Sequence, residues 1–397
     1  MPRPSAASLE MIHRLIGYDT TSRDSNLALI DWVKSYLAGH GIESRITYDD
    51  QRKKANLFAT LGPARNEGGI VLSGHTDVVP VDGQPWVTDP FKVVEKDGKL
   101  FGRGTCDMKS FVAIVLALVP EFIRRKPTQP IHVALSYDEE VGCIGVQRLI
   151  ADLGQAGIRP AACIVGEPTC MKLVIAHKGK KSWRCRVRGL ECHSSLAPQG
   201  VNAVEAACEV VAYLKGMARR HRDLGPFNRD FDIPHTTVHT GVIHGGTALN
   251  IVPLDCHFDF EFRYLPGTDV DALFAEVRQF AETKLLPEMR AVHADSGFTW
   301  EDLSEIPGLA MDENDAVVEL GKALTGANSV AKVAFGTEAG RFQEAGIPTI
   351  ICGPGDIEQA HKPNEFVSLD HLAQCETFLH RLMDRVCAGS ENQDVSS

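Results

Sequence analysis

The chain has 397 residues, of which 44% are hydrophobic and 23% are charged. This length and composition are typical of a globular protein with more than one domain. Its 52 Asp and Glu residues outnumber 41 Lys and Arg residues, and the net charge of −11 argues against non-specific binding of nucleic acid.

The first part of the chain predicts alternating helices and strands. Apolar residues recur with helical spacing over residues 9–39. The pattern then predicts strand, helix, strand, helix and strand at 69–77, 108–124, 131–140, 143–153 and 161–168. This alternation is typical of an α/β sheet covered by helices. Sites in such sheets lie beyond the carboxyl ends of the strands, and here each strand ends in polar or acidic residues, so we expect one shared site.

The pattern changes near Lys178. Basic residues alternate with other residues at 178–189, which predicts a half-exposed strand. A nucleic-acid surface is the alternative, but a solvated outer strand is favoured because no stacking aromatic residues recur there. The next elements are expected in the order helix, strand, strand and helix at 201–217, 236–243, 254–264 and 269–284. The order β-α-β-β-α-β predicts a small open-faced sandwich inserted into the larger domain.

The α/β pattern returns after about residue 289. Helices are expected at 314–324 and 369–386, on either side of an apolar strand at 348–352. The polar tail at 389–397 is expected to be disordered.

The cysteines and the apolar runs bear on location. Eleven cysteines are scattered without a Cys-x-x-Cys pair, which favours reduced thiols in a reducing compartment. The N-terminus has no apolar segment typical of a secretory signal. The longest apolar run, 111–119, is far shorter than the ~20 residues that span a bilayer. We therefore expect a cytoplasmic protein with neither a membrane nor a nucleic-acid partner.

Five residues of metal-binding type stand out, and each also has a simpler explanation. A histidine at a strand end is more often structural, Asp107 could cap the following helix, and Glu167 before Pro168 could belong to a turn. The set is more informative than its members: His75, Asp107, Glu140, Glu167 and His361. Imidazole and carboxylate are ligands that Zn²⁺ accepts, and two histidines with three carboxylates can hold two ions if one carboxylate bridges.

Two short motifs add to this set. Residues two apart in an extended segment point the same way, so Asp77 could accept the ring N–H of His75 and orient it for a metal. Three consecutive acids, Asp138 to Glu140, follow a strongly apolar strand, and such acids repel one another unless a cation is present. Adjacent side chains diverge, so one glutamate could bind metal while its neighbour faces the site. An unrelated surface turn is the alternative for each motif.

Several motifs, in this order, resemble the dizinc aminoacylase/carboxypeptidase family of metallopeptidases: GHTDVVPV, GRGTCDMK, SYDEEVG, VGEPT, HSS, GGTALNIVP and EQAHKPNE. The resemblance covers nearly the whole chain. It implies an α/β, mixed-sheet dizinc exopeptidase-like catalytic domain with an inserted ferredoxin-like α+β domain. The expected domains are residues 1–178 with 289–397, and residues 179–288.

The resemblance also implies roles for the ligand set. His75 and Glu167 would hold one metal ion, and Glu140 and His361 the other. Asp107 would bridge the two ions, and a cis peptide is expected between Asp107 and Met108. The general base would be Glu139, and Asp77 would orient His75. Zn²⁺ is the expected metal, although Co²⁺ and Mn²⁺ suit the same nitrogen and oxygen ligands.

The inserted domain is expected to act as a lid and to form a homodimer. By the same resemblance, His193 of the HSS motif would reach the active site of the partner subunit. Asn250 and Arg263 would contact the substrate from the lid.

The implied activity is hydrolysis of an N-acyl amino acid. N-acetyl-L-ornithine is the expected substrate, giving L-ornithine and acetate as in arginine biosynthesis. The alternatives are N-succinyl-diaminopimelate, a general aminoacylase substrate or a small peptide. A receptor module that has lost catalysis is a further alternative, but it should have lost the ligands or base that this chain retains.

A substrate with a cationic side chain requires a carboxylate away from the metals. Glu338, in FGTEAG, is the first candidate, and Glu358 is the second. Alternatively, Glu338 is an acid in the first turn of a helix, where the helix dipole favours it.

Overall fold

A computed structural model describes residues 2–387, so the polar tail lies outside the described residues. The described residues form two compact units, one of residues 2–176, 309–331 and 337–387 and the other of residues 177–308 and 332–336. No helix within the described residues is long and apolar enough to cross a membrane.

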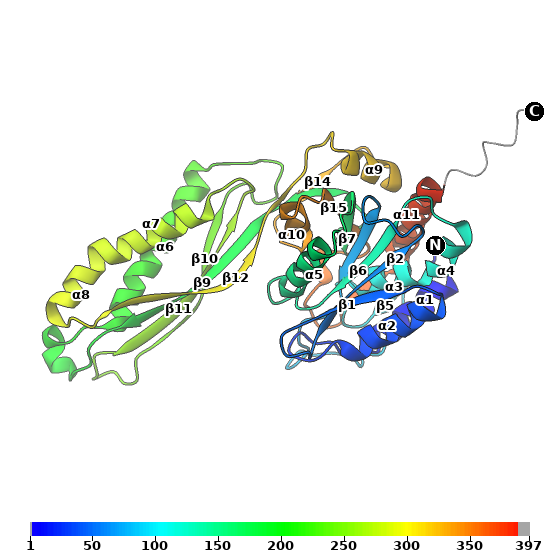
Figure 1. Ribbon diagram of the computed structural model, residues 1–397. Coiled ribbons are helices and arrows are strands. Elements are labelled where there is room, and N and C mark those ends of the chain that lie inside the picture. The colour runs from blue at the N-terminus through cyan, green and yellow to red at the C-terminus, as the bar shows by residue number, and fades with distance from the viewer. Residues whose placement is uncertain (1, 388–397) are drawn as a thin grey trace, which may run out of the picture. The chain divides into compact units, whose positions relative to one another are not determined.

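The first unit is built on a nine-stranded mixed sheet, shown in Figure 1. Its path runs β1-β2-β6-β3-β7-β15-β8-β13, and β14 pairs with β8. The strands are β1 (Ser44–Tyr48), β2 (Ala55–Leu61), β3 (Ile70–His75), β6 (Ile131–Ser136), β7 (Ala162–Pro168), β8 (Val174–His177), β13 (Leu309–Ala310), β14 (Ala331–Val333) and β15 (Thr349–Gly353). The central strands β6, β3, β7 and β15 are parallel, so their carboxyl ends lie at one edge.

Helices cover this sheet because its central strands are apolar on both faces: every residue of β3, β6 and β7 is buried. They are α1 (Ala6–Ile16), α2 (Leu27–Gly39), α3 (Lys109–Ala117), α4 (Val119–Arg125), α5 (Ile144–Gln155), α9 (Ala316–Thr325), α10 (Ala339–Glu344), the 3-10 turn η3 (Ile357–Gln359) and α11 (Leu369–Cys387). The most apolar of them, α3, has eight buried residues and packs against β3 and β7.

A small three-stranded sheet of order β16-β5-β4 lies in the same unit. Its strands are β4 (Val94–Lys96), β5 (Lys99–Phe101) and β16 (Phe366–Ser368). In the antiparallel pair of β16 and β5, Phe366 lies opposite Phe101. This pairing places the residues just before Phe366 beside the residues just after Phe101, and the latter lead to Asp107.

The second unit has the predicted order β-α-β-β-α-β. Its elements are β9 (Gly179–Arg188), the 3-10 turn η1 (Ser194–Gln199), α6 (Ala203–Leu224), β10 (Thr237–Gly245), β11 (Asp255–Tyr264), α7 (Val270–Phe280), the π turn η2 (Ala281–Leu285), α8 (Leu286–Val292) and β12 (Gly297–Ile306). The antiparallel sheet has the order β10-β11-β9-β12. Its core is aromatic, with the Trp183 ring stacked on Phe260 and Phe274.

The unit extends beyond the expected boundary of residue 288, because β12 pairs with β9 as an edge strand. Most residues of β12 are exposed or half-buried, and its sequence, GFTWEDLSEI, lacks the apolar run of a central strand. The predicted end of the inserted domain was therefore wrong.

Candidate metal centre

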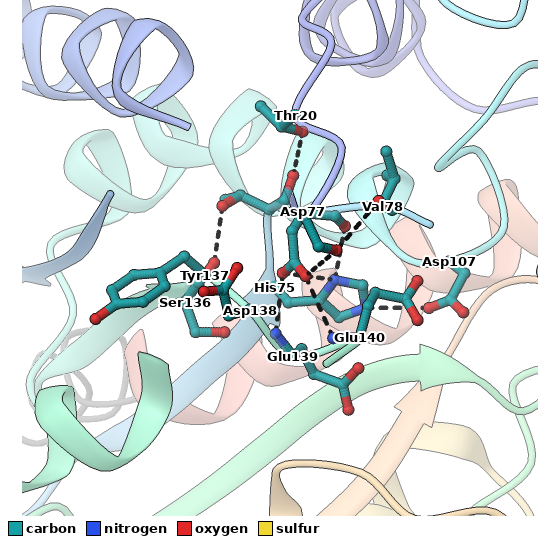
Figure 2. Close-up of polar contacts among 12 residues, drawn as sticks. Thr20, His75, Asp77, Val78, Asp107, Ser136, Tyr137, Asp138, Glu139 and Glu140 are labelled. Atoms are coloured by element: carbon teal, nitrogen blue, oxygen red, sulfur yellow. Dashed lines mark hydrogen bonds and ion pairs between the residues drawn. The ribbon is translucent and has the colours of Figure 1, made fainter. Parts of the chain in front are cut away.

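Three adjacent strands place acids and imidazoles at one edge of the large sheet. The strand β3 ends at His75, and β6 ends shortly before Glu139 and Glu140. Glu167 is near the end of β7, on the other side of β3. Because these strands are parallel, their carboxyl ends meet, as the sequence predicted. Figure 2 shows the ring of His75 between Asp77 and Asp107, with the acids after β6 beside it.

The five predicted ligands come together around Asp107. Its Oδ1 lies 3.1 Å from Nε2 of His75, and its Oδ2 lies 3.3 Å from Nε2 of His361. Glu167 Oε1 is 3.7 Å from the same nitrogen of His75, and Glu140 Oε2 is 2.9 Å from that of His361. Each oxygen of Asp107 therefore faces a different imidazole, which is the arrangement that a bridging carboxylate requires. The peptide between Asp107 and Met108 is cis, as the resemblance implied.

The charges of this cluster fit divalent cations. Burial raises the pKa of Glu139 to about 8 and that of Glu140 to about 7, and raises the pKa of Glu167 well above its ordinary value. Hydrogen bonds to Asp107 and Glu140 raise the pKa of His361 to about 10. Glu167 Oε1 is buried with no hydrogen-bond donor among the residues that the structure describes. The raised pKa values show that so many buried acids need positive charge close by. Metal ions can supply that charge in place of protons, which are released when the metal binds.

Donor atoms lie close enough to hold a metal ion. Two groups of three have their ligand atoms within 4.8 Å of one another: His75, Glu139 and Glu167, and His75, Asp107 and Glu140. Both groups contain His75, and the first contains Glu139 in addition to two of the predicted ligands.

Asp77 supports His75 differently from the prediction. Nδ1 of His75 lies 2.9 Å from the backbone carbonyl oxygen of Asp77, whereas the nearest carboxylate oxygen is 3.6 Å away. The carboxylate instead accepts the backbone N–H groups of Glu139 at 3.1 Å and Glu140 at 3.2 Å, and the hydroxyl of Ser22 at 2.9 Å. Asp77 thus ties the loop after β6 to β3, because two converging N–H groups attract its carboxylate more strongly than one ring edge.

The acids after β6 point to different partners. Asp138 forms an ion pair with Lys54 at 2.5 Å. Glu139 accepts the thiol of Cys143 at 3.2 Å through Oε1, and Glu140 pairs with His361. The divergence expected of adjacent side chains is present: within residues 2–387, Asp138 and Glu140 each form an ion pair and Glu139 forms none.

The residues predicted on the lid lie in the second unit. His193 and Asn250 are neighbours, since Ser194 N donates to the carbonyl oxygen of Asn250 at 3.0 Å. Both side chains are exposed, and Nδ1 of His193 lies 2.9 Å from the Ser195 hydroxyl. Arg263 is on β11, where its Nε donates to Glu261 at 2.9 Å. Their roles toward the substrate stay predictions.

The structure does not support Glu338 as a binding site for a substrate cation. Its side chain is 0% exposed. Its two oxygens accept the hydroxyls of Ser73 at 2.6 Å and Ser136 at 2.7 Å. Glu338 lies at the N-cap position of α10, just before the first turn, and its side chain makes no capping hydrogen bond, so it is a buried acid next to a helix terminus, close to the alternative expectation. Glu358, the second candidate, is exposed.

Sequence reasoning missed one buried acid of the site. Glu365 is 1% exposed and accepts the backbone N–H of Asp107 at 3.0 Å. The only signal for it was its place at the end of the AHKPNE motif, four residues after His361.

Comparison with known proteins agrees with this geometry. The model of peptidase family M20/M25/M40 matches residues 71–385. The chain belongs to this family. As a member of the M20 family it is a metal-dependent hydrolase with a mixed α/β fold.

Similar M20 proteins include two curated enzymes. The acetylornithine deacetylase of Pasteurella multocida (strain Pm70) is 34% identical, over 96% of this chain and 98% of the relative. The acetylornithine deacetylase of Myxococcus xanthus is 36% identical, over 94% of this chain and 96% of the relative.

Solved structures share the fold at lower identity. The M20 family metallo-carboxypeptidase Sso-CP2 from Sulfolobus solfataricus has a TM-score of 0.75 at 14% identity, and the comparison covers 96% of this chain and 99% of that one. A tripeptidase from Staphylococcus aureus has a TM-score of 0.74 at 20% identity, covering 98% and 100%.

Proposed function

We propose that this M20 hydrolase removes the acetyl group from N-acetyl-L-ornithine, giving L-ornithine and acetate, a reaction of arginine biosynthesis. The observation that carries the proposal is similarity over nearly the whole chain to relatives named acetylornithine deacetylase. The ligand cluster around Asp107 supports it, because it supplies what amide hydrolysis requires. The eleven cysteines are all unpaired, which suits a reducing compartment such as the cytoplasm.

Two Zn²⁺ ions are the proposed cofactor. His75 and Glu167 would hold one ion and Glu140 and His361 the other, with Asp107 shared between them. Co²⁺ and Mn²⁺ are compatible with the same nitrogen and oxygen donors. Such ions polarise the acyl carbonyl and make water a stronger acid.

Glu139 is the proposed general base. Its Oε1 accepts the Cys143 thiol, which leaves Oε2 to take a proton from the attacking water. The water oxygen forms a bond to the acyl carbon, and the acyl C–N bond then breaks as the same carboxyl gives the proton to the departing amine. Burial raises the pKa of Glu139 to about 8 in the ion-free site, and two bound cations would lower this pKa again, so the carboxyl would be ionised and able to accept a proton.

The second unit is proposed as a lid and dimerisation domain. His193 of the partner subunit would stabilise the negative oxygen that develops on the acyl carbon. Asn250 and Arg263 would contact the substrate. Their exposure, or half-exposure for Arg263, leaves them available for such contacts.

A hydrolysis panel tests the substrate. The metal-loaded protein should hydrolyse N-acetylornithine with a higher kcat/KM than N-succinyl-diaminopimelate, N-acetylmethionine or dipeptides. A preference for the succinyl substrate would favour the desuccinylase alternative, and a preference for N-acetylmethionine an aminoacylase. Metal analysis of the same protein should find two ions per chain.

A further inference from the structure

Glu365 is a buried carboxylate whose oxygens are both saturated by donors from one turn. Oε1 accepts the backbone N–H groups of Cys106 at 2.7 Å and Asp107 at 3.0 Å. Oε2 accepts Nη1 of Arg103 at 2.7 Å and the N–H of Gly104 at 3.1 Å. A carboxylate is costly to bury unless it is fully hydrogen-bonded, so this side chain binds the turn 103–107 with both of its acceptor oxygens.

The small sheet holds Glu365 opposite this turn. It immediately precedes β16, and the turn immediately follows β5, the strand with which β16 pairs. The N–H of Gly102 donates to the carbonyl oxygen of Glu365 at 3.0 Å, which extends the pairing by one residue. Backbone and side chain of Glu365 therefore hold the same segment, the one that ends at Asp107.

The same cluster reaches the loop of His361. Nη2 of Arg103 donates to Oε1 of Gln84 at 2.6 Å, and Nε2 of Gln84 donates to the carbonyl oxygen of His361 at 3.0 Å. His361 has a φ of 63°, a left-handed conformation that is uncommon outside glycine and that surrounding contacts must maintain. Gln84 supplies one such contact.

We propose that Glu365 is a positioning residue for the metal centre, acting through the backbone of Asp107, and that Arg103 and Gln84 extend its effect to His361. The proposal rests on the two-metal function proposed above. Because Asp107 faces both imidazoles, loss of the Glu365 contacts weakens binding of both ions. Of the proposed ligands, Gln84 is bonded only to the backbone of His361, and Arg103 keeps its own bond to Glu365 when Gln84 is lost, so that loss weakens one ion.

Zn²⁺ titration of the full-length protein against a chelating dye tests this asymmetry. Glu365→Gln replaces one acceptor oxygen by an amide that faces donors, and both Zn²⁺ affinities should fall by about 10–100-fold, as for other groups that orient ligands. Gln84→Ala should lower one affinity by a similar factor and leave the other unchanged.

Glu376→Gln is the matched control. Glu376 is also a buried carboxylate, on α11, and accepts the N–H of Ser5 at 2.9 Å and the hydroxyl of Ser8 at 2.6 Å. Its variant should lose stability without losing affinity for either ion. A similar loss of Zn²⁺ in the control would overturn the proposal, because general destabilisation would then explain the effect.

Hydrogen exchange is measured on the metal-free protein, so the result does not depend on bound ions. The amides of Cys106 and Asp107 should exchange faster in Glu365→Gln than in wild type, while the amides of β3 stay protected. Unchanged exchange and unchanged Zn²⁺ affinity would overturn the positioning role.

If Glu365→Gln does not fold, Gln84→Ala decides: loss of affinity for one ion supports the network, and loss for neither or both contradicts it. A wild-type chain that binds fewer than two ions would instead refute the proposed function.

Discussion

Glu139 differs from the adjacent Glu140 in the group that contacts its carboxylate. It accepts a thiol, which is a weak donor, whereas Glu140 pairs with the imidazole of His361. A weak partner leaves the carboxyl free to exchange a proton, and burial keeps its pKa near neutral. The surroundings of the two adjacent glutamates therefore favour different roles, a base for Glu139 and a metal ligand for Glu140.

Glu139→Gln should keep both metal ions and lose most of the rate. The amide has nearly the same shape but accepts no proton from water, and general acid–base catalysis contributes about 10²–10⁴-fold. The measured kcat should fall by a factor within that range, while the metal content stays at two ions per chain. A variant that retained more than about a tenth of the wild-type kcat would contradict the role of Glu139 as base.

At the scale of elements, Glu338 joins three of them. It lies at the N-cap position of α10, and its carboxylate accepts the hydroxyl groups of Ser73 on β3 and Ser136 on β6. Those strands carry His75 and lead to Glu139. Two hydrogen bonds to a buried carboxylate hold the strand ends and the helix together.

Glu338→Ala should therefore lower stability without changing substrate preference. The lost contacts should reduce the free energy of unfolding by about 2–4 kcal/mol, measured by urea denaturation. The kcat/KM values for N-acetylornithine and N-acetylmethionine should fall by the same factor. A loss confined to N-acetylornithine would restore Glu338 as the group that selects the cationic side chain.

The end of β8 adds a pH dependence. His177 is 0% exposed, and burial lowers its pKa to about 4, below the ordinary 6.5. The fold therefore prefers the neutral ring, and this contribution is complete above pH 6.5 and is lost as the pH falls toward 4. Between pH 7 and pH 5 it should cost about 2 kcal/mol of the free energy of unfolding.

His177→Asn should remove this part of the acid sensitivity. The amide nitrogen of asparagine can replace Nδ1, which lies 2.9 Å from the carbonyl oxygen of Lys178, but does not titrate. Urea denaturation of both proteins at pH 7 and pH 5 measures the difference. Equal losses in wild type and variant would show that His177 is not the group responsible.

At the scale of the whole molecule, the proposed chemistry is divided between the two units. The proposed metal ligands and Glu139 belong to the first unit, and His193 belongs to the second. If His193 acts on the partner subunit, each active site of a dimer uses residues from two chains.

Mixing inactive His193→Ala and Glu139→Gln chains should therefore restore activity. A mixed dimer would contain one site with both residues intact, so up to about a quarter of the wild-type rate should return at equal concentrations, because half of the randomly paired dimers are mixed and each has one of two sites. Subunit exchange must be verified with labelled chains. No recovery after exchange would count against action of His193 on the partner.

Local sequence determined much of this protein. Residue types and apolar periodicity were enough to predict the central strands β3, β6 and β7, the helices around them and the order of the second unit, since burial on both faces leaves a continuous apolar run. The meeting of His75, Glu140 and Glu167 was predictable because the carboxyl ends of parallel strands meet. Recognised motifs then supplied the roles, which sequence spacing alone left open.

Only the tertiary structure decided which groups hold the ligands in place. The sequence contains 52 acids, and neither the FGTEAG motif of Glu338 nor the AHKPNE motif of Glu365 shows which groups these acids hold. The pairing of β16 with β5 brings Glu365 to Asp107, and α10 brings Glu338 to two serines. Likewise, β12 joins the second sheet by pairing with β9 at its edge and needs no apolar run. Backbone pairing over long separations has no local sequence period, because its hydrogen bonds use groups that every residue except proline has.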